Sequence, residues 1–146
     1  MKQAIYYMEK PINKKRIIFV CAENAGRSKM AEAFFNTIAQ KKHLDWIAES
    51  AGTFPAHKIN PVVAQTMEEI GITIQDTPPK LFLSERAPKY SHIISFGCIV
   101  KSAFSQEIQK RIEEWHIEDP KDKPLTEVRV IRNEVEKYVN NLLNIL

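Results

Sequence analysis

The chain has 146 residues and a formal net charge of +3, with 44% hydrophobic and 27% charged residues. This length suits one domain with one hydrophobic core, and the composition excludes a disordered chain, a collagen-like chain and a disulfide scaffold. The small positive excess is compatible with an anionic ligand but is too small to indicate a nucleic-acid partner, so we expect none.

The apolar segments of the chain are short. Residues 17–22 form one of the longest apolar runs, and this run is far too short to span a bilayer, so we expect no membrane partner. The first 15 residues show no apolar region of the kind that secretory signals contain. Two cysteines in a chain without such a signal are typical of a reducing compartment. We therefore expect a cytoplasmic protein.

The first half of the chain alternates strand and helix patterns after an expected irregular leader over residues 1–14. Residues 16–20 (RIIFV) form a continuous apolar run, which is typical of a strand covered on both faces. Apolar residues at helical spacing follow over residues 28–42. Residues 45–50 are the second strand candidate.

A further helix is predicted to begin at Asn60 and to end at Gly71, because Asn can cap a helix and Pro61 suits its first position. After two prolines, the expected elements are a short helix within residues 80–86, a strand at 92–96, a helix at 104–113, a strand at 115–118 and a helix at 127–143. This alternation predicts one α/β domain with a parallel sheet over residues 15–146. In such folds the ligand lies at the carboxyl ends of the strands.

Residues 21–28, Cys-Ala-Glu-Asn-Ala-Gly-Arg-Ser, lie between the first strand and the first helix. Backbone N–H groups of a tight loop and a helix start can point at one anion in this place. The cysteine and the arginine are separated by five residues. In this context the spacing predicts a phosphate-binding loop with a nucleophilic thiol, rather than a buried cysteine followed by a chance arginine.

Each residue type in this loop suits attack on a tetrahedral oxyanion. The helix start and the guanidinium favour the thiolate form of Cys21 over the thiol, and Arg27 can grip two oxygens of the anion. Ser28 can donate to the sulfur. Asn24 can hold a left-handed backbone and brace the loop, and Gly26 permits a close approach. The residues expected to form the oxyanion-binding loop are Ala22, Glu23, Asn24, Ala25, Gly26, Arg27 and Ser28.

Glu23 is unusual in this loop, because a carboxylate aimed at the anion would repel it. We expect its side chain to face outward, with Lys29 nearby as partial compensation.

The segment IIFVCAENAGRSKMAEAFF resembles the signature of the low-molecular-weight protein tyrosine phosphatase superfamily, which includes the thiol-coupled arsenate reductases. The resemblance implies a four-stranded parallel sheet with helices on both faces, in agreement with the strand pattern. It also implies that Cys21 is the nucleophile, that Arg27 clamps the oxyanion, and that Asn24 and Ser28 support the loop.

Transfer of the anion to a thiolate requires a proton for the leaving oxygen. Asp119 precedes Pro120, which restricts it to extended conformations that could aim its carboxylate over the loop. The alternative is a solvent-exposed Asp-Pro turn. The superfamily carries its general acid in a late Asp-Pro motif, so the resemblance implies that Asp119 is this acid.

Cys98 follows the predicted strand at 92–96, which places it at the same edge of the sheet as Cys21. One interpretation is a buried cysteine that packs as a small hydrophobic residue. The other is a resolving thiol, which would attack the Cys21 adduct, release arsenite and leave a disulfide.

Several outer segments resemble the arsenate-reductase branch, among them residues 50–61 (SAGTFPAHKINP), 96–98 (FGC) and 115–120 (WHIEDP). Thioredoxin-coupled members of that branch carry a second resolving cysteine, but this chain has Ser102 where a third thiol could lie. Either an external thiol completes the reaction, or a Cys21–Cys98 disulfide is reduced directly, or no reduction occurs. The expected donor, if arsenate is reduced, is thioredoxin or a small thiol. We expect no bound cofactor.

The same branch has a cation site made of an Asn, a Glu, a Ser and an Asp. Asn24, Glu32 and Ser50 match it, whereas Thr73 stands at the aspartate position. The histidines also lack metal-ligand spacing, so we expect no metal.

These observations leave three hypotheses. An arsenate reductase-like enzyme would use Cys21 to attack arsenate and a second thiol to release arsenite. A phosphatase would share the first step, but water activated by Asp119 would then hydrolyse the phosphocysteine, with phosphotyrosine in a protein as the expected substrate. The third hypothesis is a non-catalytic oxyanion-binding module, and the intact set of Cys21, Arg27 and Asp119 argues against it.

Overall fold

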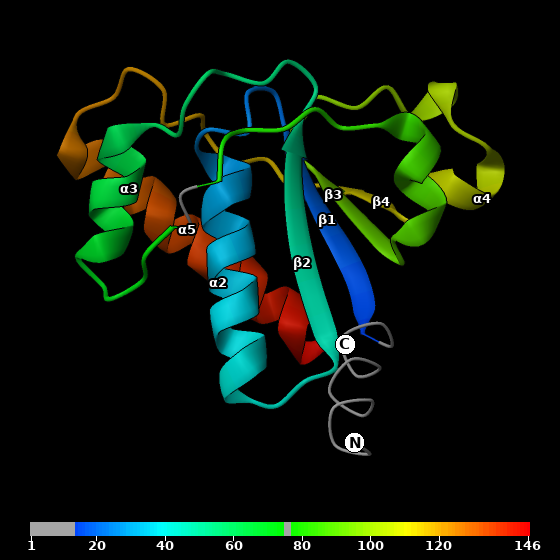
Figure 1. Cartoon of the computed structure of the whole chain (residues 1–146), viewed down its shortest axis with the longest axis horizontal. Helices are drawn as coiled ribbons and strands as arrows, with labels where there is room; N and C mark the ends of the chain where they lie inside the picture. The colour runs from blue at the N-terminus through cyan, green and yellow to red at the C-terminus, as the bar shows by residue number, and fades with distance from the viewer. Residues whose placement is uncertain (1–13, 75–76) are drawn as a thin grey trace, which may run out of the picture.

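The computed structural model describes residues 14–74 and 77–146, and the expected leader over residues 1–14 lies outside this range except for its last residue. The sheet has four parallel strands in the order β2-β1-β3-β4 (Figure 1). The elements in chain order, with η for a 3₁₀ helix, are β1 (Lys15–Cys21), α2 (Arg27–Lys41), β2 (Trp46–Gly52), α3 (Pro61–Glu68), η2 (Ser84–Lys89), β3 (His92–Ser95), η3 (Lys101–Ala103), α4 (Gln106–Gln109), β4 (Ile112–Glu114) and α5 (Leu125–Asn144).

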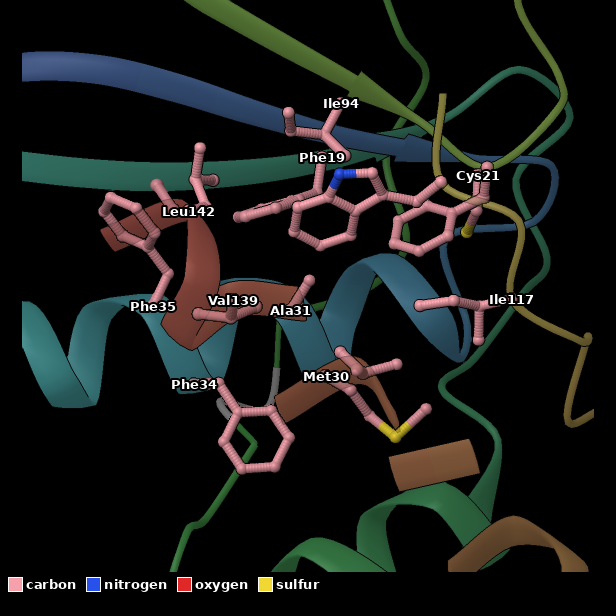
Figure 2. Close-up of a cluster of buried hydrophobic side chains, with 14 of the residues drawn as sticks. Phe19, Cys21, Met30, Ala31, Phe34, Phe35, Ile94, Ile117, Val139 and Leu142 are labelled. Carbon is pink, nitrogen blue, oxygen red and sulfur yellow. The ribbon is translucent and has the colours of Figure 1, made fainter. Parts of the chain in front are cut away.

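The predicted α/β fold is confirmed. The alternation of side chains along β1 explains why a hydrophobic core forms on each face of the sheet. Ile17 and Phe19 point into a core formed with α2, α3 and α5, whereas Ile18 and Val20 point into a second core beneath η2 and α4. β1 therefore buries both faces, as its uninterrupted apolar sequence predicts. Figure 2 shows the larger core, in which the rings of Phe19 and Phe35 meet edge to face.

Helix α3 begins as expected. The Asn60 side chain accepts hydrogen bonds from the backbone N–H groups of Val62 and Val63, and Pro61 occupies the first turn. The helix ends at Glu68, and the chain turns at Gly71, which has a φ of +80°. Arg132 of α5 then fixes α3 in place by donating to the carbonyl of Thr66 at 2.8 Å.

The prediction of the fourth strand at residues 115–118, with a helix at 104–113, is wrong. The strand is β4 (Ile112–Glu114), and α4 (Gln106–Gln109) is a single turn capped by Ser105. Ile112 belongs to the core beneath η2 and α4, whereas Trp115 belongs to the core on the opposite face. The backbone N–H of Trp115 still donates to Ser95 of β3 at 2.8 Å, so the predicted strand begins three residues too late and lies at the end of β4 and beyond it.

The short helix expected within residues 80–86 is also displaced, to η2 (Ser84–Lys89). Residues 80–82 instead run beside the end of β2, where the backbone N–H of Gly52 donates to Lys80 and the N–H of Phe82 donates to Gly52. This extended segment is needed to support the loop that follows β1, as described below.

Candidate active site

The loop of residues 21–28 joins the carboxyl end of β1 to α2, so the predicted phosphate-binding loop lies at the expected edge of the sheet. Cys21 is 3% exposed. Its Sγ accepts a hydrogen bond from the backbone N–H of Asn24 at 3.2 Å and lies 2.9 Å from the Oγ of Ser28. These contacts hold the sulfur at the base of the loop.

Asn24 braces the loop in the way that the sequence predicts. Its φ is +52°, and its side chain is fully buried. Its Nδ2 donates to the hydroxyls of Ser28 at 2.8 Å and Ser50 at 3.0 Å, and its Oδ1 accepts from the backbone N–H of Lys80 at 3.0 Å. One amide side chain thus ties the loop to β2 and to the segment after α3.

Two glycines allow the backbone to approach closely at the site. A Cβ on Gly26 would lie 2.8 Å from Cγ of Pro120, which explains the predicted need for glycine there. A Cβ on Gly52 would lie 2.7 Å from the carbonyl oxygen of Ala22, so β2 also needs a glycine where it passes the loop. The sequence analysis missed Gly52, although a glycine at the end of a predicted strand is a signal of close backbone approach.

Arg27 is held at the edge of the loop by backbone carbonyls. Its Nη1 donates to Ile117 at 3.0 Å and to Phe96 at 3.5 Å, and its guanidinium carbon lies 5.5 Å from the Phe96 ring centroid. The Nη2 atom lies 3.7 Å from Oδ2 of Asp119. The guanidinium is therefore positioned before any anion binds, and the structure brings Asp119 to it from the far end of the chain.

Asp119 lies beside the loop, and its side chain is 51% exposed. Its Oδ1 accepts from the backbone N–H of Lys121, as in a turn, while its Oδ2 faces Arg27. Asp119 thus combines features of both interpretations of the Asp-Pro pair. It forms an exposed turn, and it also lines the same pocket as Cys21.

The Glu23 side chain is partly exposed and lines the pocket that also contains Cys21, and its predicted neighbour is wrong. Its carboxylate pairs with Lys121 at 2.9 Å, and this ion pair raises the pKa of Lys121. Lys29 is instead 4% exposed, and its Nζ donates to both the carbonyl and the hydroxyl of Thr77 at 3.2 Å. Lys29 turns inward because the first turn of α2 places it on the side of the helix that faces the segment after α3.

Cys98 reaches the edge of the sheet occupied by Cys21, and both cysteines are free thiols. The Cys98 Sγ donates to the carbonyl of Val20 at 3.3 Å, and its backbone N–H donates to the Ser95 hydroxyl. Burial raises the pKa of the Cys98 thiol, and the Ser95 hydrogen bond opposes this rise. Cys98 also packs against the core beneath η2 and α4, so its geometry accommodates both interpretations.

A pocket of about 430 Å³ opens over Cys21, Arg27 and Asp119. Its apolar wall consists of Ala56, Ile59, Pro61, Val62 and Pro120. Lysine side chains also line it, namely Lys58, Lys121 and Lys123. Glu23, Asp119 and Asp122 line it as well, so the pocket combines side chains of both charges with room for more than a bare tetrahedral anion.

Within residues 14–74 and 77–146, no group of three or more His, Cys, Asp and Glu side chains is arranged to hold a metal ion. Over the same residues, no helix has both the length and the apolar character needed to cross a membrane.

Known proteins that are similar to this chain include arsenate reductases and a protein tyrosine phosphatase. A "Glutaredoxin arsenate reductase" of Synechocystis sp. is 32% identical over 130 residues, which cover 88% of this chain and 96% of that protein. The solved structure of an arsenate reductase in the phosphate binding state is 30% identical, with a TM-score of 0.75 and coverage of 89% and 97%. A low molecular weight protein tyrosine phosphatase from T. tengcongensis is 25% identical, with a TM-score of 0.82 and coverage of 91% and 100%.

The family model for low molecular weight phosphotyrosine protein phosphatase matches residues 16–146. The chain therefore belongs to the low molecular weight phosphotyrosine protein phosphatase family.

Proposed function

We propose that this protein is a thiol-dependent arsenate reductase. The observation that carries the proposal is the position of the second thiol: the Cys98 Sγ donates to the carbonyl of Val20, the residue immediately before Cys21. A phosphatase needs one nucleophilic cysteine, whereas a reductase needs a second sulfur within reach of the first. The relatives named arsenate reductase, which align over almost their whole length, support the same choice.

In the first step the Cys21 thiolate attacks the arsenic of arsenate. An S–As bond forms and an As–O bond breaks, and Asp119 donates the proton that the leaving oxygen needs. Arg27 and the backbone N–H groups of the loop stabilise the negative charge on the remaining oxygens. Asn24 keeps these donors in place through its bonds to Ser28 and to the backbone of Lys80.

In the second step the Cys98 thiolate attacks the Cys21 sulfur. An S–S bond forms, and the electron pair of the S–As bond stays on arsenic, which is reduced from As(V) to As(III) and leaves as arsenite. Cys98 must first lose its proton, because burial raises its pKa.

The Cys21–Cys98 disulfide is then reduced by an external thiol, because the chain has only two cysteines. The candidate donors are thioredoxin, a small thiol, and glutaredoxin, since the Synechocystis relative is named for it. All three act in a reducing compartment, so we place the protein in the cytoplasm.

The test is arsenite production by the full chain over many turnovers, with arsenate and each donor in turn. We expect arsenite with at least one donor, and Cys21→Ser should form none while it still binds phosphate. Cys98→Ser should lose arsenite production and keep its cleavage of an aryl phosphate. Absence of arsenite with every donor, from protein that cleaves the aryl phosphate, would contradict the reductase.

A phosphatase is the second candidate, and the pocket is the observation that favours it. Its volume of about 430 Å³ and its apolar wall exceed what arsenate requires, and they suit an organic group attached to phosphate, such as the ring of phosphotyrosine in a protein. In that case Asp119 activates water to hydrolyse the phosphocysteine. Equal loss of both activities in Cys98→Ser would assign Cys98 to packing and favour this candidate.

A further inference from the structure

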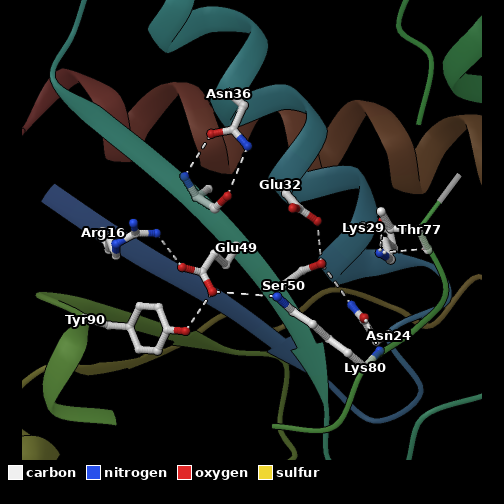
Figure 3. Close-up of polar contacts among 11 residues, drawn as sticks. Arg16, Asn24, Lys29, Glu32, Asn36, Glu49, Ser50, Thr77, Lys80 and Tyr90 are labelled. Atoms are coloured by element: carbon white, nitrogen blue, oxygen red, sulfur yellow. Dashed lines mark hydrogen bonds and ion pairs between the residues drawn. The ribbon is translucent and has the colours of Figure 1, made fainter. Parts of the chain in front are cut away.

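A chain of hydrogen bonds runs from Glu32 in α2 to the nucleophile, and Figure 3 shows its first part, from Glu32 through Ser50 to Asn24. The Ser50 hydroxyl donates to Oε1 of Glu32 at 2.5 Å. Asn24 Nδ2 donates to Ser50 and to Ser28, and the Oγ of Ser28 lies 2.9 Å from the Cys21 sulfur. The chain thus connects a carboxylate in the helix to the reactive thiol.

The donor and the acceptor of each bond follow from the chemistry of the groups it joins. An ionised carboxylate only accepts, so Ser50 must donate to Glu32 and can accept from Asn24. The amide of Asn24 has no lone pair on nitrogen, so it donates again to Ser28. The single hydroxyl hydrogen of Ser28 is then free to point at Cys21, as attack by a thiolate requires. Glu32 therefore fixes the position of Ser50, and Ser50 in turn fixes the Asn24 amide that donates to Ser28.

Lys29 supplies the positive charge beside this carboxylate. It is 4% exposed, and its Nζ is fixed by two hydrogen bonds to Thr77. Burial lowers the pKa of Lys29, and the charge of Glu32 opposes this shift through space. Burial likewise raises the pKa of Glu32, and the Ser50 hydrogen bond and the charge of Lys29 oppose that rise. Lys29, Glu32, Thr73 and Thr77 line one small cavity of about 150 Å³.

The arsenate-reductase branch, by resemblance, would place a cation near this point, but the residues present do not fit one. Cations of this kind need several free oxygen ligands. The Oδ1 of Asn24 already accepts from the backbone of Lys80, and the Ser50 hydroxyl is used in both directions. Thr73 replaces the fourth, acidic ligand. The ammonium of Lys29 would in addition repel a second positive charge in the same cavity.

We infer that Lys29 is a built-in cation of the nucleophile loop: its ammonium supplies the positive charge opposite Glu32 that a bound monovalent cation would otherwise supply. Lys29 is a positioning residue, since it touches neither Cys21 nor the pocket over it and acts through Glu32, Ser50 and Asn24. The consequence is a loop that keeps its oxyanion-binding geometry without potassium.

The first test compares cations on the unmodified protein. Its melting temperature and its affinity for inorganic phosphate are measured in potassium chloride, sodium chloride and choline chloride at equal ionic strength. We expect the same values in all three salts. A rise in melting temperature or in phosphate affinity that is specific to potassium would overturn the inference.

The second test removes the charge. Lys29→Met keeps the length of the side chain, and we expect its phosphate affinity to fall about tenfold in choline chloride. Lys41→Met is the matched control, because it removes an exposed lysine from the other end of α2. If Lys29→Met does not fold, Lys29→Gln serves in its place. Unchanged phosphate affinity in the neutral variant would overturn the inference.

The third test restores the charge from outside, which a merely structural role for Lys29 would not allow. The double variant Lys29→Met/Thr73→Asp adds a carboxylate to the emptied cavity, and we expect potassium to raise both its melting temperature and its phosphate affinity. If potassium changes neither value in the double variant, the ammonium of Lys29 and a bound cation are not equivalent. The inference rests on the proposed function only through phosphate binding. If the protein binds phosphate but does not reduce arsenate, these measurements still test the inference. If the unmodified protein does not bind phosphate, the oxyanion site itself is overturned.

Discussion

The floor of the pocket, residues 21–28, and its rim, residues 118–123, are built in opposite ways. In the floor, Asn24 and Ser28 are fully buried and joined to their neighbours by short hydrogen bonds. In the rim, Asp119 is half-exposed and meets Arg27 only at 3.7 Å. The difference indicates that the loop proposed to bind the tetrahedral anion is preorganised, while the carboxylate proposed to supply the proton can adjust.

The largest effect is expected when the side chain that holds the floor together, Asn24, is removed. Asn24→Ala leaves the hydroxyls of Ser28 and Ser50 and the N–H of Lys80 without their partner. We expect kcat/KM to fall about 100-fold and the free energy of unfolding to fall by about 2–4 kcal/mol. Steady-state kinetics and denaturant unfolding measure the two effects.

Asn36→Ala is the matched control for this variant. Asn36 also lies on a buried part of the molecule and makes two hydrogen bonds, both to the backbone of Ala48. We expect it to lose stability but to keep phosphate affinity. If both variants lose phosphate affinity equally, Asn24 acts through general stability and the floor is not a specialised brace.

A smaller effect is expected at the rim. Asp119→Asn should slow cleavage of aryl phosphates by about 10–100-fold for basic leaving groups and much less for acidic ones, because only the former need a proton. Rates are measured over a series of phenols. Glu118→Gln is the control, since this neighbouring carboxylate is exposed and pairs with Lys123. A uniform loss over the series would remove Asp119 from the acid role.

In the proposed redox step Cys98 attacks Cys21, which lies in the floor. The rate of arsenite release should therefore depend on pH. Burial raises the pKa of Cys98, so the thiol form dominates at pH 7 and the thiolate fraction grows with pH. Arsenite release in single turnovers should therefore accelerate by up to about tenfold per pH unit above neutrality, if the step is limited by this deprotonation. Aryl phosphate cleavage measured in parallel should lack this rise. The same profile in Cys98→Ser would contradict the assignment.

The smallest effect is expected from the outer edge of the rim. Lys121 neutralises Glu23, which lies within the loop that binds the anion. Lys121→Met should weaken phosphate binding by about two- to threefold, because an exposed ion pair is screened by water. Adding Glu23→Gln should restore the affinity. A larger loss, or no restoration, would mean that Lys121 contacts the anion directly.

Local patterns carried most of the fold prediction, and the failures occurred where packing overrode them. The apolar pattern of the sequence predicts the strand at β1 and the helices α2 and α5, and Asn60 predicts the start of α3. The fourth strand was misplaced because the residues that pair with β3, Ile112–Glu114, include two glutamates, whereas the buried Trp115 and Ile117 lie just beyond them. A run of apolar residues shows that a segment is buried, but it does not show which residues pair in the sheet.

By itself, the sequence determined the position of residues 21–28 between β1 and α2 and the local contacts of Cys21, Asn24 and Ser28, because these residues are contiguous and interact over short spacings. Only the tertiary structure decided which distant groups complete it. The carbonyl of Ile117 holds Arg27, Gly52 makes room for the loop, and Lys29 turns toward Thr77 instead of Glu23. These contacts join residues far apart in the chain, and side-chain direction at such points is set by packing between elements rather than by local sequence.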